Sequence, residues 1–257
     1  DANILKKMNV YQGTDKAIID WGSFNIDTLE HVDFKLSQGG VTLNRVTGND
    51  PSQILGKLTS NGDLWLVNPN GVFFGNNAQV DVHGLVATTS NITNSNFTNG
   101  NYNFDIPSNF SNAIFNQGTI TAAEGGLVAL VAPGVQNLGV INARLGKVSL
   151  ASGKTFTLDL YGDQLINLGV DSKVVDQVTG INGETLSSRV TNSGKIFADD
   201  EGYEFSQKYN VSTKDGWRKY IGTMAKNCGR KGVTMGGSKE LSKKTIDLTI
   251  QFFKENL

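Results

Sequence analysis

From Asn116 to Ala143 the chain reads N-Q-G-T-I-T-A-A-E-G-G-L-V-A-L-V-A-P-G-V-Q-N-L-G-V-I-N-A, and the repeats in this stretch decide the fold. The pattern Asn-x-Gly-x-Ile-x-Ala starts at Asn116 and again 21 residues later, at Asn137. A third copy starts at Asn192, after a further 55 residues. Because 55 is not a multiple of 21, we expect an insertion around 155–190.

A repeat of about 20 residues is the length of one coil of a β-solenoid, in which short strands of about 3.3 Å per residue alternate with turns. A second repeat, Gly-x-Val-x-Leu, occurs at 126–130 and at 146–150. Stacking these units places Ile120 over Ile141, and each coil then buries its apolar face against its neighbours. A β-sandwich would show turns every ~8–12 residues without a fixed register. The sequence therefore predicts an all-β parallel solenoid.

The first 90 residues fit the same scheme less regularly. A solenoid exposes strand edges at its ends, and we expect residues 3–34 to form a cap at the amino-terminal end. The Asn-, Ser- and Thr-rich segment 91–112 is predicted to leave the solenoid as a hairpin that covers one face. Short strands are predicted at Ala17–Ile19, Val32–Lys35, Val41–Leu43, Leu64–Val67, Val72–Phe74 and Gln79–Val82.

The composition excludes several classes of protein. A net charge of −1 argues against a general nucleic-acid binder, so no nucleic-acid partner is expected. One cysteine, Cys228, excludes an internal disulfide framework and a cysteine-cluster zinc site. No apolar run approaches the length of a membrane-spanning helix. The chain starts at Asp1 without a leader, and we expect a mature or truncated chain from which an export signal was removed.

The charge changes sign near residue 200. Residues 1–200 hold 12 basic and 18 acidic residues, whereas 201–257 hold 11 and 6. We therefore predict two parts, a β-helical domain at 1–200 and a basic, helical tail at 201–257. In the tail, Ser238–Phe253 has the pattern of an amphipathic helix, and a second helix is expected at Asp215–Lys226.

The order and spacing of several motifs closely resemble the two-partner secretion domain of filamentous-haemagglutinin-like exoproteins of Gram-negative bacteria. The resemblance covers residues 3–200 and is most specific over 43–89. It rests on Asp15–Asn25, Leu43–Ser52, Ile54–Gly56, Asn61-Gly62, Leu66–Gly75 and Ala78–Thr89.

This resemblance implies a right-handed parallel β-helix with an amino-terminal cap and extra-helical β-hairpins. It implies an amino-terminal domain of an adhesin or haemagglutinin that crosses the inner membrane by the Sec machinery. The POTRA domains of a cognate outer-membrane transporter would then recognise it, and the exoprotein would fold outside the cell. The domain would be a secretion-targeting signal and a folding seed, that is, the part of the exoprotein that folds first, with no catalytic role and no cofactor. Any binding to host-cell receptors would belong to the parent protein, at the cell surface or secreted.

Two motifs are candidate recognition or folding elements. Asn68-Pro69-Asn70-Gly71 has the residue types of a tight β-turn, with proline at its second position. The same turn could also contact the transporter or nucleate folding. Asn44 and Arg45 could lie at a partner surface, or Arg45 could hold a local loop by bonding backbone carbonyls or Asp50.

No catalytic or metal site is predicted. His31 and His83 have no partner at metal-ligand spacing, and Asp81 beside His83 is expected to form a surface pair. No nucleophile and base stand out for acid–base or covalent chemistry. An alternative makes the chain the amino-terminal part of a contact-dependent toxin or a haemolysin. The segment 201–257 would then be an effector, or else an unrelated joined sequence.

Overall fold

The computed structural model describes residues 6–107, 112–159, 166–167, 177–180 and 184–198. All of them belong to one compact unit, Asp1–Asp199. The helices predicted in the segment 201–257 lie outside the described residues. Within the described part, no helix is both long and apolar enough to cross a membrane.

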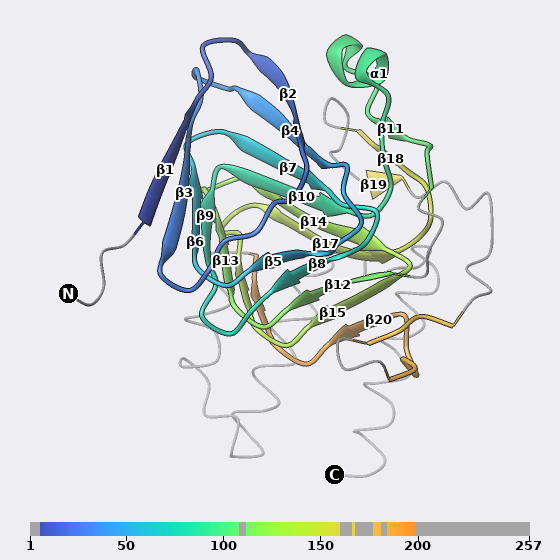
Figure 1. The fold of residues 1–257 in the computed structure, drawn as a ribbon. Coiled ribbons are helices and arrows are strands. Elements are labelled where there is room, and N and C mark those ends of the chain that lie inside the picture. The colour runs from blue at the N-terminus through green and yellow to red at the C-terminus, as the bar shows by residue number, and fades with distance from the viewer. Residues whose placement is uncertain (1–5, 108–111, 160–165, 168–176, 181–183, 199–257) are drawn as a thin grey trace, which may run out of the picture. The chain divides into compact units, whose positions relative to one another are not determined.

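Three parallel sheets wind around a common core in about six coils, and each full coil gives one segment to each sheet (Figure 1). Sheet A contains β1 (Lys6–Tyr11), β3 (Glu30–Lys35), β6 (Lys57–Ser60), β9 (Gln79–Val82), β13 (Thr119–Ala122), β16 (Val140–Asn142) and β21 (Lys195–Phe197). Sheet B contains β2 (Lys16–Trp21), β4 (Val41–Val46), β7 (Asp63–Val67), β10 (Gly84–Thr88), β14 (Leu127–Ala132) and β17 (Lys147–Ser152). Sheet C contains β5 (Ser52–Ile54), β8 (Val72–Phe74), β12 (Ala113–Asn116), β15 (Gly134–Asn137) and β20 (Val190–Asn192).

The predicted register is confirmed. Ile120 pairs with Ile141, and Ile141 pairs with Ile196 of the third repeat. The two Gly-x-Val-x-Leu segments also stack, with Val128 opposite Val148. Each of the six short strands predicted in the first 90 residues lies within an observed strand. The prediction of an all-β parallel solenoid is therefore correct.

The Asn-x-Gly repeats form a ladder at the corner between sheets C and A. The Asn116 side-chain amide donates to Oδ1 of Asn137 at 2.7 Å, and Asn137 donates in the same way to Asn192 at 2.7 Å. Asn116 and Asn137 are fully buried, so each of these bonds replaces a hydrogen bond to water that the amide loses on burial. The glycine that follows allows the coils to approach closely, because a β-carbon at Gly139 would collide with the carbonyl oxygen of Gly118.

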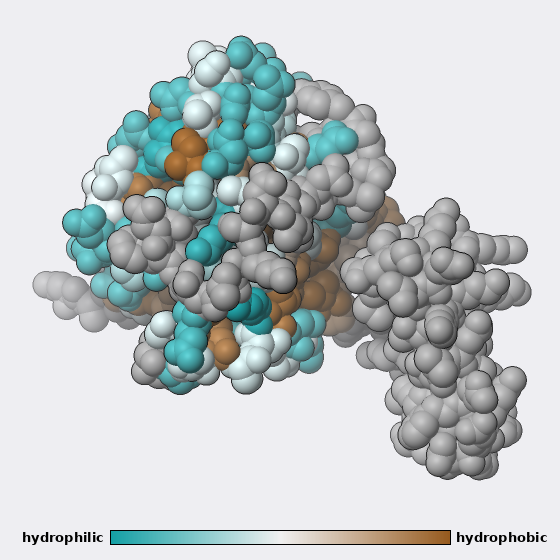
Figure 2. All heavy atoms as spheres, turned by 90° about the vertical axis from the view of Figure 1, so that its right-hand side faces the viewer, coloured by the Kyte–Doolittle hydropathy of each residue, from teal (hydrophilic) through white to brown (hydrophobic). Residues whose placement is uncertain are grey.

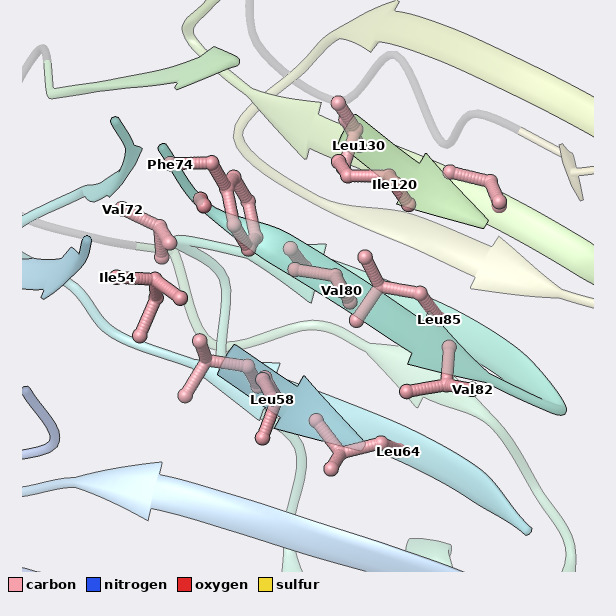
Figure 3. Close-up of a cluster of buried hydrophobic side chains, with 14 of the residues drawn as sticks. Ile54, Leu58, Leu64, Val72, Phe74, Val80, Val82, Leu85, Ile120 and Leu130 are labelled. Carbon is pink, nitrogen blue, oxygen red and sulfur yellow. The ribbon is translucent and has the colours of Figure 1, made fainter. Parts of the chain in front are cut away.

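The core between the three sheets is filled by side chains that alternate inward along each strand. Figure 3 shows these side chains from successive coils lying over one another. Each coil alone has too little apolar surface to form a core, so stability comes from the contacts between coils. The labelled core residues are Ile54, Leu58, Leu64, Val72, Phe74, Val80, Val82, Leu85, Ile120 and Leu130.

The predicted amino-terminal cap is the first coil of the solenoid itself. Its strands β1 and β2 pair parallel with β3 and β4, and Ile26 continues the coil through a bridge to Ile54. Trp21 contacts Phe24 edge-on at 5.3 Å, and Phe24 in turn packs on Phe34. These aromatic rings close that end of the core.

Two insertions lie outside the solenoid, as predicted. The ends of the first insertion pair antiparallel through a bridge between Asn91 and Ile106, but it is not a plain two-stranded hairpin, because a helix lies between these ends. This segment forms helix α1 (Asn94–Asn99) and then strand β11 (Asn103–Phe104). β11 pairs antiparallel with β18 (Phe156–Leu158) of the second insertion, and β18 pairs with β19 (Ile166–Asn167) as an extra-helical hairpin. The helix forms despite its many asparagines because Thr93 caps its start and Phe97 is buried beneath it.

The insertions cover an apolar outer face of sheet B. Trp65 on β7 contacts Phe97 at 5.3 Å and Tyr102 at 4.7 Å between ring centroids. Phe104 of the first insertion stacks on Phe156 of the second at 4.4 Å. Figure 2 views the side on which the insertions lie, and its upper part, where α1 lies, is mostly hydrophilic. The middle strands β7 and β10 of sheet B are therefore buried on both faces, whereas the outermost strands β2 and β17 are mostly half-buried.

We expect Gly139→Ala to lower the free energy of unfolding by about 1–3 kcal/mol, because the added methyl group must push two coils apart. Gly22→Ala is the matched control. A β-carbon at Gly22 would meet no atom within 4 Å, so stability should stay equal or rise by up to about 1 kcal/mol. Urea unfolding followed by circular dichroism measures both, and equal midpoints for the two variants would contradict the stacking geometry.

Candidate functional site

The Asn68–Gly71 segment is a tight turn, as predicted. The backbone N–H of Gly71 donates to the carbonyl oxygen of Asn68 at 3.0 Å, and Oδ1 of Asn68 accepts from the backbone N–H of Asn70 at 2.9 Å. Pro69 takes the second position, where its fixed φ suits the turn. Gly71 has φ +106°, a conformation that residues with a β-carbon rarely adopt.

The turn is bonded to the preceding coil through its two asparagines. The buried side chain of Asn68 donates to the Asp50 carbonyl and to the Ser52 hydroxyl, both at 3.0 Å. The side-chain amide of Asn70 donates to the Gly48 carbonyl at 2.8 Å. Neither asparagine is free in the folded domain, so the motif has a structural role at the corner between sheets B and C.

The turn is also bonded to the following coil. The backbone N–H of Asn68 donates to the Thr88 carbonyl at 3.0 Å, and the Asn112 side chain donates to the Pro69 carbonyl at 2.9 Å. Gly71 lies so close to Ala113 that a β-carbon would be 2.7 Å from its carbonyl oxygen. Asn68 and Gly71 are buried, whereas Pro69 and Asn70 are half-buried. Only the middle of the turn is therefore accessible to a partner.

Asn44 lies inside the solenoid. It is fully buried, and its Oδ1 accepts a hydrogen bond from the Trp21 indole N–H at 3.0 Å. This bond satisfies two polar groups that lie beside the core and joins the first coil to the second. Asn44 is not available to a partner of the folded domain.

Arg45 points to the opposite face of β4, where it holds the base of the first insertion. Its guanidinium donates to the Asn91 side chain at 2.8 Å, to the Ile92 carbonyl at 2.9 Å and to the Asn94 side chain at 3.0 Å. It also pairs with Asp20 of the first coil at 3.0 Å.

The side chain of Arg45 is only 13% exposed, so the loop-holding interpretation fits the structure better than a partner surface. Of the two kinds of partner predicted for Arg45, a backbone carbonyl is confirmed by the bond to Ile92, whereas the acidic partner is Asp20 and not Asp50. Asp20 lies next to Arg45 in the sheet register, whereas Asp50 lies at the following corner.

A family model described as "TPS secretion domain" matches residues 2–217. The chain belongs to the family of two-partner secretion domains. Exoproteins with this domain are secreted by Gram-negative bacteria through the periplasm, with a cognate outer-membrane transporter as partner.

This two-partner secretion domain is similar in sequence to two proteins of Haemophilus influenzae. A heme/hemopexin-binding protein of strain Rd is 36% identical over 203 residues, which are 76% of this chain and 22% of that protein. Another heme/hemopexin-binding protein from this species is 44% identical over 99 residues, 38% of this chain and 11% of that one. The chain therefore covers only about a fifth of the length of the first relative and about a tenth of the length of the second.

The crystal structure of the HMW1 secretion domain from Haemophilus influenzae has the same fold. It superimposes with a TM-score of 0.61 at 34% sequence identity, over 77% of this chain and 49% of that one. The parallel β-solenoid is thus the architecture of a solved secretion domain.

The sequence did not reveal three contacts of the two-partner secretion domain. Lys16 donates to the carbonyls of Phe97 and Thr98 at the end of α1, each at 3.1 Å, and lies 5.1 Å from the centre of the Tyr102 ring. The Trp21–Asn44 bond and the Asn112 bond to the turn were also missed. In each case the partners belong to different coils or to an insertion, so no local pattern could indicate them.

Both histidines contact side chains of neighbouring coils. Nδ1 of His83 lies 2.6 Å from Oδ1 of Asp63, so the partner of His83 is Asp63 of the previous coil and not Asp81 as expected. In the part of the chain that the structure describes, no group of three or more His, Cys, Asp or Glu residues could hold a metal ion.

A charged cluster on the outer face of sheet A ties the first three coils together. Asp33 is buried and pairs with Lys7 at 2.8 Å and with Lys35 at 3.1 Å. The Thr59 hydroxyl donates to Asp33 at 2.7 Å and lies 2.8 Å from Nε2 of His31. Burial alone would raise the pKa of Asp33, but the bonds from Lys7, Thr59 and Lys35 outweigh it and hold the pKa well below its usual value. Burial and the nearby lysines lower the pKa of His31.

We expect Asn68→Ala to lower the free energy of unfolding by about 2–3 kcal/mol. The change leaves the Asp50 carbonyl and the Ser52 hydroxyl without their donor at a buried corner. The matched control is Asn76→Ala at the next, exposed turn, where stability should change by less than about 0.5 kcal/mol. Urea midpoints measure both, and an equally small effect at Asn68 would mean that the turn does not hold the coils together.

We expect the stability of the domain to fall in acid, with Asp33 responsible for the loss below about pH 4. Because the folded pKa of Asp33 is lowered, its stabilisation is complete above its unfolded pKa of about 3.9 and is lost as the pH falls toward the folded pKa. At pH 7, Asp33→Asn should cost about 1–3 kcal/mol, since both lysines are partly exposed.

Urea unfolding of wild type and Asp33→Asn at several pH values tests this assignment. The difference between the two proteins should shrink as the pH falls below about 4. Asp81→Asn, at an exposed position of the same face, is the control and should show no such convergence. A difference that stays constant with pH would exclude Asp33 as the titrating group.

Proposed function

We propose that the domain directs the export of a longer exoprotein and seeds its folding outside the cell. In this proposal the chain reaches the periplasm by the Sec machinery, and the POTRA domains of the cognate outer-membrane transporter then bind it. The observation that carries the proposal is the Asn68–Gly71 turn, bonded to the coils on both sides, in a chain matched by the secretion-domain model over 2–217.

The folding role is supported by the short range of the contacts that the turn makes. Its side-chain bonds to the preceding coil join residues 16, 18 and 22 positions apart, which is about one coil. A chain that emerges from a pore can form such bonds as soon as one further coil has left. Nearest-neighbour stacking lets folding start at one end and propagate.

Recognition by the transporter is supported by two features. Pro69 and Asn70 are half-buried, so part of the turn remains open to contact in the folded domain. In an unfolded passenger all four residues of the motif would be available, and an extended segment could add to a sheet edge of a POTRA domain. Asn44 and Arg45 act through the fold in this proposal, by holding the first coil and the first insertion.

The parent protein is proposed to be an adhesin or haemagglutinin that is released or stays at the cell surface. Its contacts with host receptors would lie outside the described coils, which carry out export and folding by binding and not by catalysis. This part of the proposal is supported by the resemblance of 43–89 to filamentous-haemagglutinin-like exoproteins and by the fold shared with the HMW1 secretion domain.

The test is binding of the purified chain, folded and urea-unfolded, to the periplasmic domains of the outer-membrane transporter encoded beside it. We expect saturable binding that Asn70→Ala weakens about tenfold, or about 1.4 kcal/mol, with unchanged circular dichroism. Asn76→Ala is the control and should bind like wild type. If neither form binds, the secretion-address proposal is wrong; if both variants bind normally, recognition does not involve the turn.

A further inference from the structure

The first coil of the solenoid is far less buried than the coils that follow it. Strand β1 has five exposed residues and one half-buried residue, and β2 is half-buried apart from the exposed Asp20. By contrast, all five residues of β10 in the fourth coil are buried. Segments with little buried apolar surface open locally at a low cost in free energy. By burial alone, the first coil should therefore open far more readily than the middle of the solenoid.

The side chain of Lys16 on β2 connects this coil to the first insertion. Its ammonium group donates to the carbonyl oxygens of Phe97 and Thr98, each at 3.1 Å, and lies 5.1 Å from the centre of the Tyr102 ring. Both carbonyls belong to the last turn of α1, where a positive charge is favourable. Because the donor is charged, these bonds are stronger than those between neutral groups.

Arg45 on β4 holds the other end of the same helix. Its guanidinium donates to the side chain of Asn94, the first residue of α1, and to the Ile92 carbonyl just before the helix. The ion pair of Arg45 with Asp20 also reaches back to β2. Two cations from the first two coils therefore hold α1, one at its start and one at its end.

The underside of the insertion is anchored on the third coil. Phe97 and Tyr102 contact Trp65 of β7, and all three side chains are buried. A helix of six residues is not stable by itself, so α1 depends on these contacts. The insertion is therefore fixed on the well-buried part of sheet B and bonded from there to the poorly buried first coil.

We propose that the first insertion, residues 91–106, is a strap that locks the first coil onto the solenoid. If β2 opens while the strap stays in place, Lys16 loses both carbonyl acceptors and Asp20 loses Arg45. Lifting the strap with β2 costs the buried contacts of Phe97 with Trp65 instead. Both routes are costly, so the strap gives the first coil a stability that its own burial does not supply.

The strap also sets an order of events in export, and this part of the inference rests on the proposed function. The Asn68–Gly71 turn bonds to residues about one coil earlier, whereas Lys16 bonds to residues 81 and 82 positions later. The first coil would therefore form early but be locked only after the first insertion had left the pore.

Native-state hydrogen exchange of the full chain tests the lock, with mass spectrometry of peptides from β2, α1 and β14. Lys16→Met keeps an apolar stem and removes the charged donor. We expect about tenfold faster exchange of the β2 amides, which corresponds to about 1.4 kcal/mol, and no change in β14. Lys57→Met, at an exposed position of sheet A, is the matched control and should change neither segment.

A second variant separates the lock from a local effect at Lys16. Thr93→Ala removes the cap of α1, in which the Thr93 hydroxyl accepts from the backbone N–H of Asn96 at 3.1 Å within the insertion itself. If the strap locks the first coil, losing this cap should speed exchange about fivefold in both α1 and β2.

Three outcomes would overturn the proposal. They are unchanged β2 exchange in Lys16→Met, faster exchange in α1 but not in β2 for Thr93→Ala, and an equal acceleration in β14 for either variant. None of these measurements involves the transporter, so the lock can fail while the proposed function stands, and the reverse.

Discussion

The in-register stacking of parallel coils is the constraint on which the rest of this domain depends. Each strand residue pairs with a residue at the equivalent position of the next coil, and these stacked positions form a column. A residue type that packs well at one position of a column therefore packs well at the others. The isoleucines at 120, 141 and 196 and the asparagines at 116, 137 and 192 are such columns. A shift of one residue would turn the isoleucines outward and break the ladder, which is why the repeat is visible in the sequence.

The candidate site departs from this repetition. Asn68–Gly71 has no copy in the neighbouring coils, and its two asparagines bond to backbone and hydroxyl groups instead of to stacked amides. The contacts of Arg45 also do not follow the repeat, because they join the first coil to the base of an insertion. The two motifs predicted as recognition or folding elements thus lie where the solenoid is bonded to something other than its own repeat.

Sheet B gives the domain a second apolar layer, which lies between its outer face and the two insertions. The outer face of β7 carries Trp65, whose aromatic partners come from 97–104. That insertion is itself held by Phe156, which comes about fifty residues later. In the proposed export, coils would stack as they leave a pore, but the covering of sheet B would be complete only after the second insertion has joined.

The sequence by itself determined the repeat, its register and the turn, because these depend on residues one coil apart or less. Ile120 over Ile141 and the hydrogen bond that closes the turn both follow from local patterns. Only the tertiary structure decided that Arg45 pairs with Asp20, that His83 pairs with Asp63, and that a helix and a strand lie between Asn91 and Ile106. These outcomes depend on which coils and insertions become neighbours, and burial of Phe97 on Trp65 outweighs the poor helix propensity of asparagine.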